Sequence, residues 1–373
     1  MKGGIFHLRM IKCSNCLRDY PNQGVPFRCP ICGGVYDFIT TFPFDPALID
    51  RSQSGIWKYR HTFELIDQAL AITLGEGDTP LIWTQIFGKE VGFKLEFLNP
   101  TGSFKDRGTA VLVSFLKSRL IEEIVEDSSG NAGSSLAAYS ARAGIRAIIY
   151  IPEYTSGPKK NQIEAFGAQL VRIPGPRSNT SEAVLQAAYQ GKVYASHAYL
   201  PQGLAGYATV AYELVEQIGG APGSILIPAG QGNLMLGIGR GFNSMRLAGY
   251  ITSNPALIGV QALACAPLWA VAQYGTAGLG WITEGDTLAE GVRIRNPMRG
   301  DVVIRTVQES GGYFCATEEE KIMPGRAELA RLGFYVEPTS AIVWDVLEQQ
   351  VHNLPEPIVV ILTGSGLKYL GDN

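Results

Sequence analysis

Apolar residues in most of this chain gather into short uninterrupted runs, and longer segments of helical composition separate the runs. Runs of this kind are typical of strands that are buried on both faces of a parallel sheet. The segments between them are long enough to form the helices that connect parallel strands. The predicted strands are 92–97, 147–151, 169–173, 225–229, 258–262 and 358–362, and the predicted helices are 104–121, 132–143, 159–166, 204–218, 234–246 and 318–332.

This alternation predicts an α/β protein. The length of 373 residues fits two open parallel-sheet α/β subdomains better than a single sheet. The first 40 residues differ from the rest, because they hold four of the six cysteines and no long periodic segment. A proline-containing linker at 41–46 follows them. We therefore expect a small cysteine unit at 1–40 and a larger domain, made of two α/β subdomains, at 41–373.

The composition excludes several classes of function. The 31 Lys and Arg residues nearly balance the 34 Asp and Glu residues, so the formal net charge is −3. Such a chain is not built to coat nucleic acid or an anionic membrane. One uncharged stretch, 247–283, is interrupted by prolines and glutamines, which indicates buried strand and helix pieces and not a membrane span. The N-terminus shows no apolar leader, so we expect a cytoplasmic protein.

Four cysteines form two Cys-x-x-Cys pairs, Cys13 with Cys16 and Cys29 with Cys32, and 12 residues separate the pairs. Each pair places two thiolates on one edge of a tetrahedron, which is the arrangement of a structural zinc ribbon. Gly33 lets the backbone turn after the second pair. Four thiolates leave no open position for a substrate, so we expect a structural Zn²⁺. Two redox-active pairs, or buried thiols without a role, are the alternative interpretations.

The segment 94–108 contains the first candidate for catalysis. A predicted strand ends in the turn Pro100-Thr101-Gly102, and a helix is predicted to begin with Ser103 as its N-cap. Lys105 would lie in the first turn of that helix, where the positive helix end lowers the pKa of an amine. An amine of this kind is suited to form a Schiff base with a carbonyl cofactor. Taken alone, the pattern also fits an ordinary exposed helix lysine.

Two polar, glycine-containing loops each follow a strand-like run and open a predicted helix. The loop Ser128-Ser129-Gly130-Asn131 offers hydroxyls and backbone amides to an anion at a helix N-terminus, and Gly230-Gln231-Gly232-Asn233 does the same. A dinucleotide fingerprint fails at the second loop, because Met235 stands where its third glycine is required. Thr363 follows another buried strand, at the sheet edge where ligands bind in open α/β proteins.

These residues belong to a set of segments that carry a family resemblance: Gly75-Glu76-Gly77-Asp78-Thr79-Pro80-Leu81, 99–108, 128–131, 230–233, Val336-Glu337-Pro338-Thr339-Ser340-Ala341 and 362–368. Together they resemble pyridoxal-phosphate enzymes of the tryptophan-synthase-β fold, and most of all the threonine synthases. The resemblance runs from about residue 70 to the C-terminus, and several threonine synthases also carry an N-terminal cysteine ribbon.

The resemblance implies pyridoxal phosphate as the cofactor of a catalytic domain at 41–373. It makes Lys105 the Schiff-base lysine and brings Asn131 to the cofactor's ring hydroxyl. Thr363 would hydrogen-bond the pyridine nitrogen. The loop Gly230, Gln231, Gly232 and Asn233 would cradle the cofactor phosphate.

A hydroxyl at Thr363, unlike a carboxylate, would leave the pyridine nitrogen largely unprotonated. The reaction would then rely on Lys105 as acid and base and on a good leaving group, which favours elimination or replacement at the β or γ carbon. Ser128, Ser129 and Gly130 would bind the substrate carboxylate. We expect a homodimeric, threonine synthase-like lyase that converts the small amino acid O-phosphohomoserine to threonine and phosphate.

The chain departs from the threonine synthase pattern where the substrate phosphate is expected to bind. Ala132 replaces a hydroxyl residue, Gly203 stands near an expected arginine, and Ala208 replaces a lysine. The alternative is a threonine or serine dehydratase, or another β-elimination or β-replacement enzyme, although the histidine of the dehydratase pattern is also absent. From a different class, a zinc-ribbon binding module with an inactive α/β domain is a further alternative. Arginines elsewhere would have to supply the missing charge: Arg172, Arg177, Arg293, Arg295 and Arg299.

Overall fold

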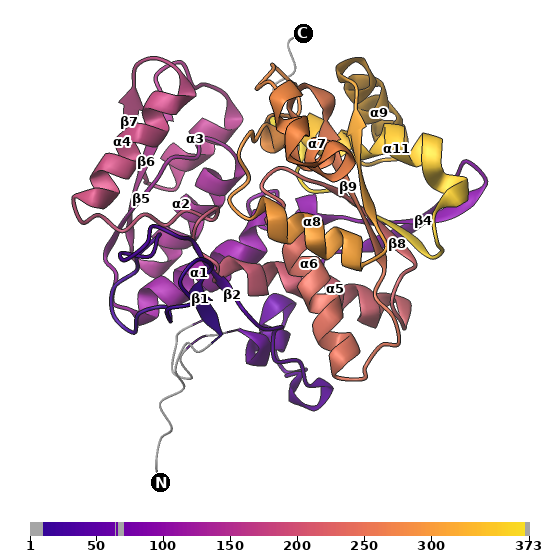
Figure 1. Ribbon diagram of the computed structural model, residues 1–373, viewed down its shortest axis with the longest axis horizontal. Coiled ribbons are helices and arrows are strands. Elements are labelled where there is room, and N and C mark those ends of the chain that lie inside the picture. The colour runs from indigo at the N-terminus through magenta and orange to yellow at the C-terminus, as the bar shows by residue number, and fades with distance from the viewer. Residues whose placement is uncertain (1–9, 64, 66–70, 370–373) are drawn as a thin grey trace.

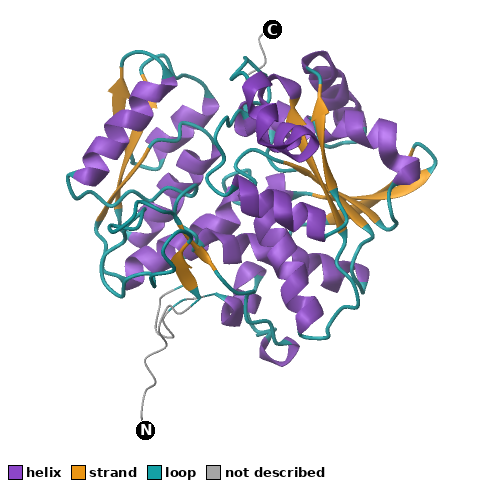
Figure 2. Cartoon of the chain, in the orientation of Figure 1, coloured by secondary structure: helices purple, strands orange, loops and turns teal. Residues whose placement is uncertain are grey.

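A computed structural model of the chain describes residues 10–63, 65 and 71–369. Two α/β lobes stand side by side, and the cysteine-bearing segment lies against them (Figure 1). Helices cover the strands of each lobe (Figure 2). The strands of the described residues form three sheets. The predicted α/β class with two parallel-stranded sheets is confirmed.

The larger sheet has six strands in the order β10-β9-β8-β11-β4-β3. Its neighbouring strands are parallel except for β3 and β4, which form an antiparallel hairpin at one edge. Every residue of the central β11 is buried, as expected for a strand covered on both faces. The strands are β3 (Leu81–Ile86), β4 (Lys89–Lys94), β8 (Ser224–Pro228), β9 (Ala256–Ala262), β10 (Tyr313–Thr317) and β11 (Ile358–Ile361).

The smaller sheet has three parallel strands in the order β5-β6-β7: β5 (Glu123–Glu126), β6 (Arg146–Pro152) and β7 (Gln169–Ile173). A parallel bridge between Val125 and Tyr194 brings the segment after Tyr194 alongside the carboxyl end of β5. Three helices accompany this sheet in its lobe (Figure 1): α2 (Asn131–Ala143), α3 (Pro158–Ala165) and α4 (Arg177–Tyr189).

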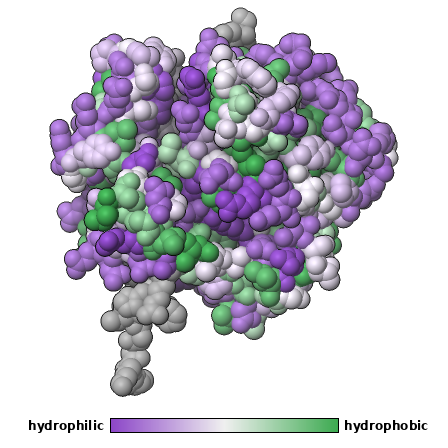
Figure 3. Space-filling model, viewed as in Figure 1, coloured by the Kyte–Doolittle hydropathy of each residue, from purple (hydrophilic) through white to green (hydrophobic). Residues whose placement is uncertain are grey.

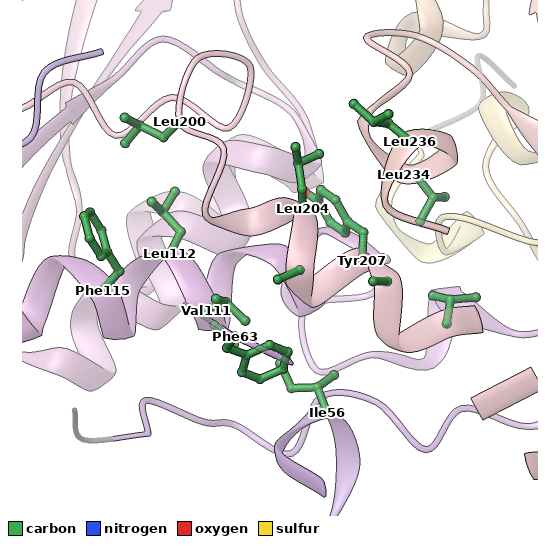
Figure 4. Packing of buried hydrophobic residues seen from close by; sticks show 14 of the residues in the cluster. Ile56, Phe63, Val111, Leu112, Phe115, Leu200, Leu204, Tyr207, Leu234 and Leu236 are labelled. Atoms are coloured by element: carbon green, nitrogen blue, oxygen red, sulfur yellow. The ribbon is translucent and has the colours of Figure 1, made fainter. Parts of the chain in front are cut away.

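Three helices near the centre of the molecule share one hydrophobic core: α1 (Lys105–Ser118), α5 (Gly203–Ile218) and α6 (Asn233–Leu247). Figure 4 shows Leu112 of α1, Leu204 of α5 and Leu234 of α6 in this cluster. A Cβ at Gly206 would lie 2.1 Å from the Arg107 carbonyl oxygen, so α1 and α5 pack backbone to backbone. The remaining helices are α7 (Pro267–Tyr274), α8 (Gly300–Glu309), α9 (Glu319–Arg331), α10 (Pro338–Ala341) and α11 (Val343–Gln350).

Two local predictions in the segment 94–108 are wrong. The strand predicted at 92–97 ends at Lys94, because Glu96–Leu98 forms a 3₁₀ turn. Ser103 is not the N-cap of α1, since Phe104 takes that position without a side-chain cap. The carboxylate of Asp106 instead accepts hydrogen bonds from the backbone amide and the hydroxyl of Thr101, at 2.6 and 2.7 Å. A side chain from the first turn of α1, that of Asp106, therefore stabilises the turn that precedes the helix.

The cysteine segment contains the antiparallel pair β1 (Ile11–Cys13) and β2 (Tyr36–Phe38). Tyr20 of this segment makes edge contacts with Tyr36 and with Phe115 of α1, so the segment shares its core with the larger domain. The face of the molecule in Figure 3 is mostly hydrophilic, with hydrophobic residues in small groups. In the described part of the chain, no helix has the length and apolar character that a membrane span requires.

Candidate active site

Lys105 is the first residue of α1, which packs between α2 and α5. Its amine lies over the ring of Phe104, 4.6 Å from the ring centroid. Burial lowers the pKa of Lys105 to about 8, while Glu126 and Glu337 oppose this shift in their ionised forms. Burial thus adds to the effect of the helix end that the sequence predicts. A larger fraction of such amines is neutral and nucleophilic near pH 7 than of ordinary lysines.

Thr363 lies two residues after the end of β11 and beside the start of α1. Its carbonyl oxygen accepts a hydrogen bond of 3.0 Å from the backbone amide of Phe104. Its hydroxyl oxygen is 2.9 Å from the hydroxyl oxygen of Ser340, which also accepts a 2.9 Å hydrogen bond from the amide of Gly364. The segment of Thr363 and the segment of Lys105 are therefore neighbours at the carboxyl edge of the larger sheet.

Asn131 opens α2 and faces the same edge. Its side-chain nitrogen donates a 2.7 Å hydrogen bond to Glu337, whose second carboxylate oxygen is 3.0 Å from the amine of Lys159. The side-chain oxygen of Asn131 is buried and has no hydrogen-bond partner among the described residues. Since the amide of Glu337 also donates to the Gly364 carbonyl, this residue ties Asn131 to the Thr363 segment.

The loop 230–233 connects β8 to α6. Gly232 has a φ of 77°, and a Cβ there would lie 2.7 Å from the side chain of Val303. A Cβ at Gly230 would lie 2.8 Å from the carbonyl oxygen of Gly291. The side chains of Gln231 and Asn233 are used to fix the loop, accepting from the amide of Met298 and donating to the carbonyl of His197. Only glycines fit these two positions, and the backbone of the loop stays close to the helix N-terminus.

The loop 128–130 connects β5 to α2, and Gly130 is the N-cap of this helix. The hydroxyl of Ser128 accepts a 3.3 Å hydrogen bond from the amide of Gly130. Just before the loop, Asp127 accepts hydrogen bonds from Tyr194 and Ser181 at 2.6 and 2.9 Å and is 2.9 Å from Arg177. The loop is thus held in place by a carboxylate whose two oxygens are both occupied.

Two functional candidates were not found from the sequence: Glu126, at the end of β5, and His197, which follows the bridge to that strand. Glu126 Oε1 lies 3.7 Å from His197 Nδ1, and the glutamate side chain is only 2% exposed. Neither Glu126 Oε2 nor His197 Nδ1 has a hydrogen-bond partner among the described residues. The only signal in the sequence was an acidic residue, Glu126, at the end of a strand and two positions before a polar loop; no pattern marked His197.

A second cluster of buried charges lies on the other side of the start of α1 and consists of Arg107, Glu96, Glu213 and Lys94. Arg107 is 2.7 Å from both Glu96 and Glu213, and Lys94 is 2.7 Å from Glu213. These side chains are 0 to 2% exposed. Thr79, from the segment 75–81, donates to Glu96 at 2.7 Å, which gives this motif a structural role. We call this group the ion-pair cluster.

The four cysteines of the N-terminal segment converge. Their sulfur atoms all lie within 4.8 Å of one another, and the amide of Gly33, which has a φ of 71°, donates to the carbonyl of Cys29. Four thiol groups at this spacing could hold one metal ion. The cluster is formed by Cys13, Cys16, Cys29 and Cys32.

The arginines that the sequence offers as anion ligands differ in their surroundings. Arg299 is buried and donates to the carbonyls of Tyr36, Ala198 and Tyr199, so it joins the cysteine segment to the residues after His197. Arg293 pairs with Asp286, and Arg172 lies 3.9 Å from Glu164. Arg177 borders the loop 128–130, through its contact with Asp127.

This fold and this site define a class. Residues 72–364 match the family model described as "Pyridoxal-phosphate dependent enzyme". The chain belongs to this family of pyridoxal-phosphate-dependent enzymes, and its two parallel-stranded sheets have the architecture of the tryptophan-synthase-β-like members.

Within the family, the chain is similar to threonine synthases. It is 30% identical to the threonine synthase of Methanocaldococcus jannaschii over 96% of this chain and 92% of that protein. It is 32% identical to the threonine synthase of Synechocystis sp. over 88% of each chain. Among solved structures, a threonine deaminase from T.th. has a TM-score of 0.65 at 24% identity, covering 79% of this chain and 94% of that one. This last likeness supports the fold alone.

The residues present fit pyridoxal phosphate. Lys105 offers a buried amine of lowered pKa, and Asn131 offers a buried oxygen that has no partner in the described part of the chain. The loop 230–233 has glycines where side chains would collide and opens a helix, which suits a phosphate group. Thr363 offers a hydroxyl at the carboxyl end of β11.

Proposed function

We propose that this protein is a threonine synthase-like lyase that converts O-phosphohomoserine and water to threonine and phosphate. The observation that carries the proposal is the similarity to threonine synthases over 96% of the chain, a span that includes residues on both sides of residue 40. Support also comes from the convergence of the segments of Lys105, Asn131 and Thr363 at one sheet edge.

In this proposal each residue has the cofactor or substrate contact that the family resemblance implies. Lys105 holds the cofactor, Asn131 contacts its ring hydroxyl and Thr363 contacts its ring nitrogen. The loop formed by Gly230, Gln231, Gly232 and Asn233 binds the cofactor phosphate. Ser128, Ser129 and Gly130 bind the substrate carboxylate at the N-terminus of α2, where backbone amides and the helix dipole favour an anion.

Bound pyridoxal phosphate would supply an electron sink for the electrons that remain when a Cα–H bond breaks. The chain's own residues do the rest. The amine of Lys105 takes the Cα proton and returns it at a neighbouring carbon. Glu337 keeps Asn131 in place through a 2.7 Å hydrogen bond, and Ser340 keeps the hydroxyl of Thr363 in place at 2.9 Å.

A phosphate leaving group needs cations. Lys159 and Arg177 are the two basic side chains of the described residues that we propose for this role. Lys159 lies 3.0 Å from Glu337, and Arg177 lies 2.9 Å from Asp127. Lys159 thus contacts Glu337, the partner of Asn131, and Arg177 contacts Asp127, which directly precedes the loop 128–130. Each would have to share its charge with a carboxylate, which weakens its attraction for phosphate.

We propose further that residues 1–40 form a zinc ribbon, with Cys13, Cys16, Cys29 and Cys32 as ligands of one structural Zn²⁺, and that 41–373 form the catalytic domain. The thiol spacing supports the metal, and the shared core supports a structural role for it. A cytoplasmic homodimer is part of the same proposal, on the family resemblance.

A second candidate is elimination of ammonia from threonine or serine. It is favoured by Ala132 and Gly203, because an apolar or absent side chain at these positions contributes no ligand to a phosphate. Threonine and serine carry no phosphate and need no such ligand. Each missing charge-assisted contact would cost about 1.5–3 kcal/mol of binding free energy.

The test is to measure phosphate release from O-phosphohomoserine beside ammonia release from threonine and serine. We expect phosphate release together with threonine formation. Ammonia without phosphate would establish the second candidate and overturn the first. Borohydride treatment of the purified holoenzyme should attach the cofactor to a peptide that contains Lys105.

A matched pair of variants sharpens the assignment of the phosphate ligands. Lys159→Met should raise the KM for O-phosphohomoserine, whereas Lys160→Met should leave it unchanged. Lys160 is the neighbour of Lys159 on α3, and its amine pairs with the exposed carboxylate of Glu164 at 2.9 Å instead of with Glu337.

A further inference from the structure

Glu126, which is buried, and His197, whose side chain is 24% exposed, form a polar pair that the proposed function leaves unused. Glu126 is 2% exposed, and its oxygen Oε2 has no hydrogen-bond partner among the described residues. His197 Nδ1, 3.7 Å from Glu126 Oε1, also has none there. Buried polar atoms without partners are rare in folded proteins, and a catalytic role is one reason why such atoms occur.

The position of the pair points to the substrate side of the site. Glu126 ends β5, and the loop 128–130 follows it after one residue. The charge of Lys105 acts on both members of the pair, so all three groups share one poorly solvated region. The main chain of His197 is also bound to the cofactor loop, because its carbonyl accepts a 2.8 Å hydrogen bond from Asn233.

A purely structural role does not account for Glu126. The neighbouring Asp127 already anchors the segment before the loop, with three partners on its two oxygens. Glu126 Oε2 adds no hydrogen bond to that anchor from any described residue. An apolar side chain would therefore serve the fold at this position at least as well.

We propose that Glu126, beside His197, is a further catalytic acid of this site, and that it gives its proton to the oxygen of a hydroxyl leaving group at the β carbon of the substrate. The substrate class is then the β-hydroxy amino acids, such as serine and threonine. This inference rests on the proposed lyase site at Lys105, and it does not depend on whether O-phosphohomoserine is used as well.

The electrostatics agree with an acid that holds its proton. Burial raises the pKa of Glu126 well above its usual range, and the nearby Asp127 adds to the shift. Arg177 and Lys105 act in the opposite direction. Burial also lowers the pKa of His197 well below its usual range, and Lys105, Arg177 and Arg299 add to this effect. A neutral carboxyl beside a neutral imidazole is therefore the favoured state.

Two protons move when the hydroxyl group is eliminated: the Cα proton and the proton of the Glu126 carboxyl. Lys105 takes the Cα proton, and the electrons of that bond form the Cα–Cβ double bond. The Cβ–O bond breaks with its electron pair on oxygen, and the proton of Glu126 moves to this oxygen, so that water leaves. The proton on Lys105 then restores the carboxyl of Glu126. A hydroxide ion is a poor leaving group, which is why this step needs an acid.

The decisive experiment compares two leaving groups in the holoenzyme. Chloride leaves β-chloro-L-alanine without a proton, whereas the hydroxyl of L-serine needs one. In Glu126→Gln we expect kcat/KM to fall about 100-fold or more for L-serine and to stay within about 3-fold for β-chloro-L-alanine. Glu123→Gln makes the same change at the start of β5, away from the site, and should alter neither value.

Several results would overturn the inference. A wild-type enzyme that eliminates chloride but never a hydroxyl would do so, and so would an equal loss on both substrates in Glu126→Gln, which indicates a structural role. If the wild-type enzyme releases phosphate from O-phosphohomoserine but eliminates no hydroxyl, the proposed function stands without the inference. If it processes neither O-phosphohomoserine, L-serine nor β-chloro-L-alanine, the proposed function itself fails.

A readout that does not require activity completes the test. The infrared spectrum of the cofactor-free protein at pH 7 should contain the band of a protonated carboxyl that disappears in Glu126→Gln and remains in Glu123→Gln. Absence of such a band would mean an ionised Glu126 and no acid. Should Glu126→Gln fail to fold, His197→Asn should show the same selective loss on L-serine, about 10-fold; an unselective loss there counts against the pair.

Discussion

Two buried polar clusters border the start of α1, and they differ in how many of their polar groups have a partner. In the ion-pair cluster, Arg107 contacts two glutamates at 2.7 Å, and each of these carboxylates has further partners. In the other, which we call the Lys105 cluster and which contains Lys105, Glu126 and His197, polar atoms remain without partners among the described residues. Lys105 and Arg107 are two positions apart, so they leave the helix in different directions.

The contrast shows how burial acts on charge. Arg107 meets two carboxylates, which offset its desolvation cost and raise its pKa further from neutral pH. Lys94 has to share Glu213 with Arg107, so burial still lowers its pKa. Where the opposite charge is missing or distant, burial moves the pKa toward neutral pH, as for Lys105. The first cluster can stabilise the fold, and the second can exchange protons.

The largest expected effect concerns the Lys105 cluster. Lys105→Ala should lower turnover by about 10³- to 10⁴-fold, because the site loses its acid and base. The free energy of unfolding of the cofactor-free protein should not fall, since a buried amine is removed. Steady-state kinetics and denaturant unfolding measure the two quantities. Normal turnover in this variant would refute the assignment of Lys105.

The opposite result is expected in the ion-pair cluster. Arg107→Met should lower the free energy of unfolding by about 3–5 kcal/mol, because Glu96 and Glu213 would keep buried charges without their main partner. Arg142→Met, at an exposed position of α2, serves as the control and should change it by less than about 0.5 kcal/mol. A similar stability for both variants would show that the two clusters do not differ as proposed.

The pKa of Lys105 provides a third contrast. With a pKa of about 8, half of the Lys105 amines are neutral at pH 8, against about one in 300 for an ordinary lysine. Because the neutral amine is the nucleophile, the rate at which cofactor-free protein reacts with pyridoxal phosphate should rise with pH and level off above about 8. A rate that still rises beyond pH 10 would mean an unshifted amine.

The smallest effect tests the link between the cysteine segment and the site. Arg299 joins Tyr36 to Ala198, and the amide of Met298 donates to the side chain of Gln231 in the loop 230–233. If the four cysteines hold Zn²⁺ as proposed, removing it with a chelator should therefore weaken pyridoxal phosphate binding by about 5- to 150-fold, a usual range for coupled sites. Fluorescence titration before and after chelation measures this change. Unchanged affinity would show that the ribbon and the site are independent.

Local patterns in the sequence predicted several elements and the positions of the candidate site residues. The predicted strand at 169–173 has the bounds of β7, and the predicted strands at 225–229 and 258–262 correspond to β8 and β9. Lys105 and the two glycine loops are recognisable because helix starts and tight turns need particular residues at particular spacings. The same holds for the Cys-x-x-Cys pairs. Their roles in catalysis and metal binding stay predictions.

The sequence was least informative where contacts join distant segments. Ser103 is a good N-cap by its residue type, yet Thr101 and Asp106 close that turn. Arg299 looks like a free anion ligand, yet its guanidinium is occupied by three backbone carbonyls. Each outcome depends on which partner the fold brings within hydrogen-bond distance.

Short-range patterns were enough to define the α/β class, the positions of the candidate lysine and loops, and the cysteine pairs, because hydrophobic period and turn chemistry act over a few residues. Long-range packing was needed to pair Arg107 with its glutamates and to bring Glu126 beside His197. Such pairing depends on the order of strands in the two sheets and on the removal of water from charged groups. No short segment of the sequence determines either of these.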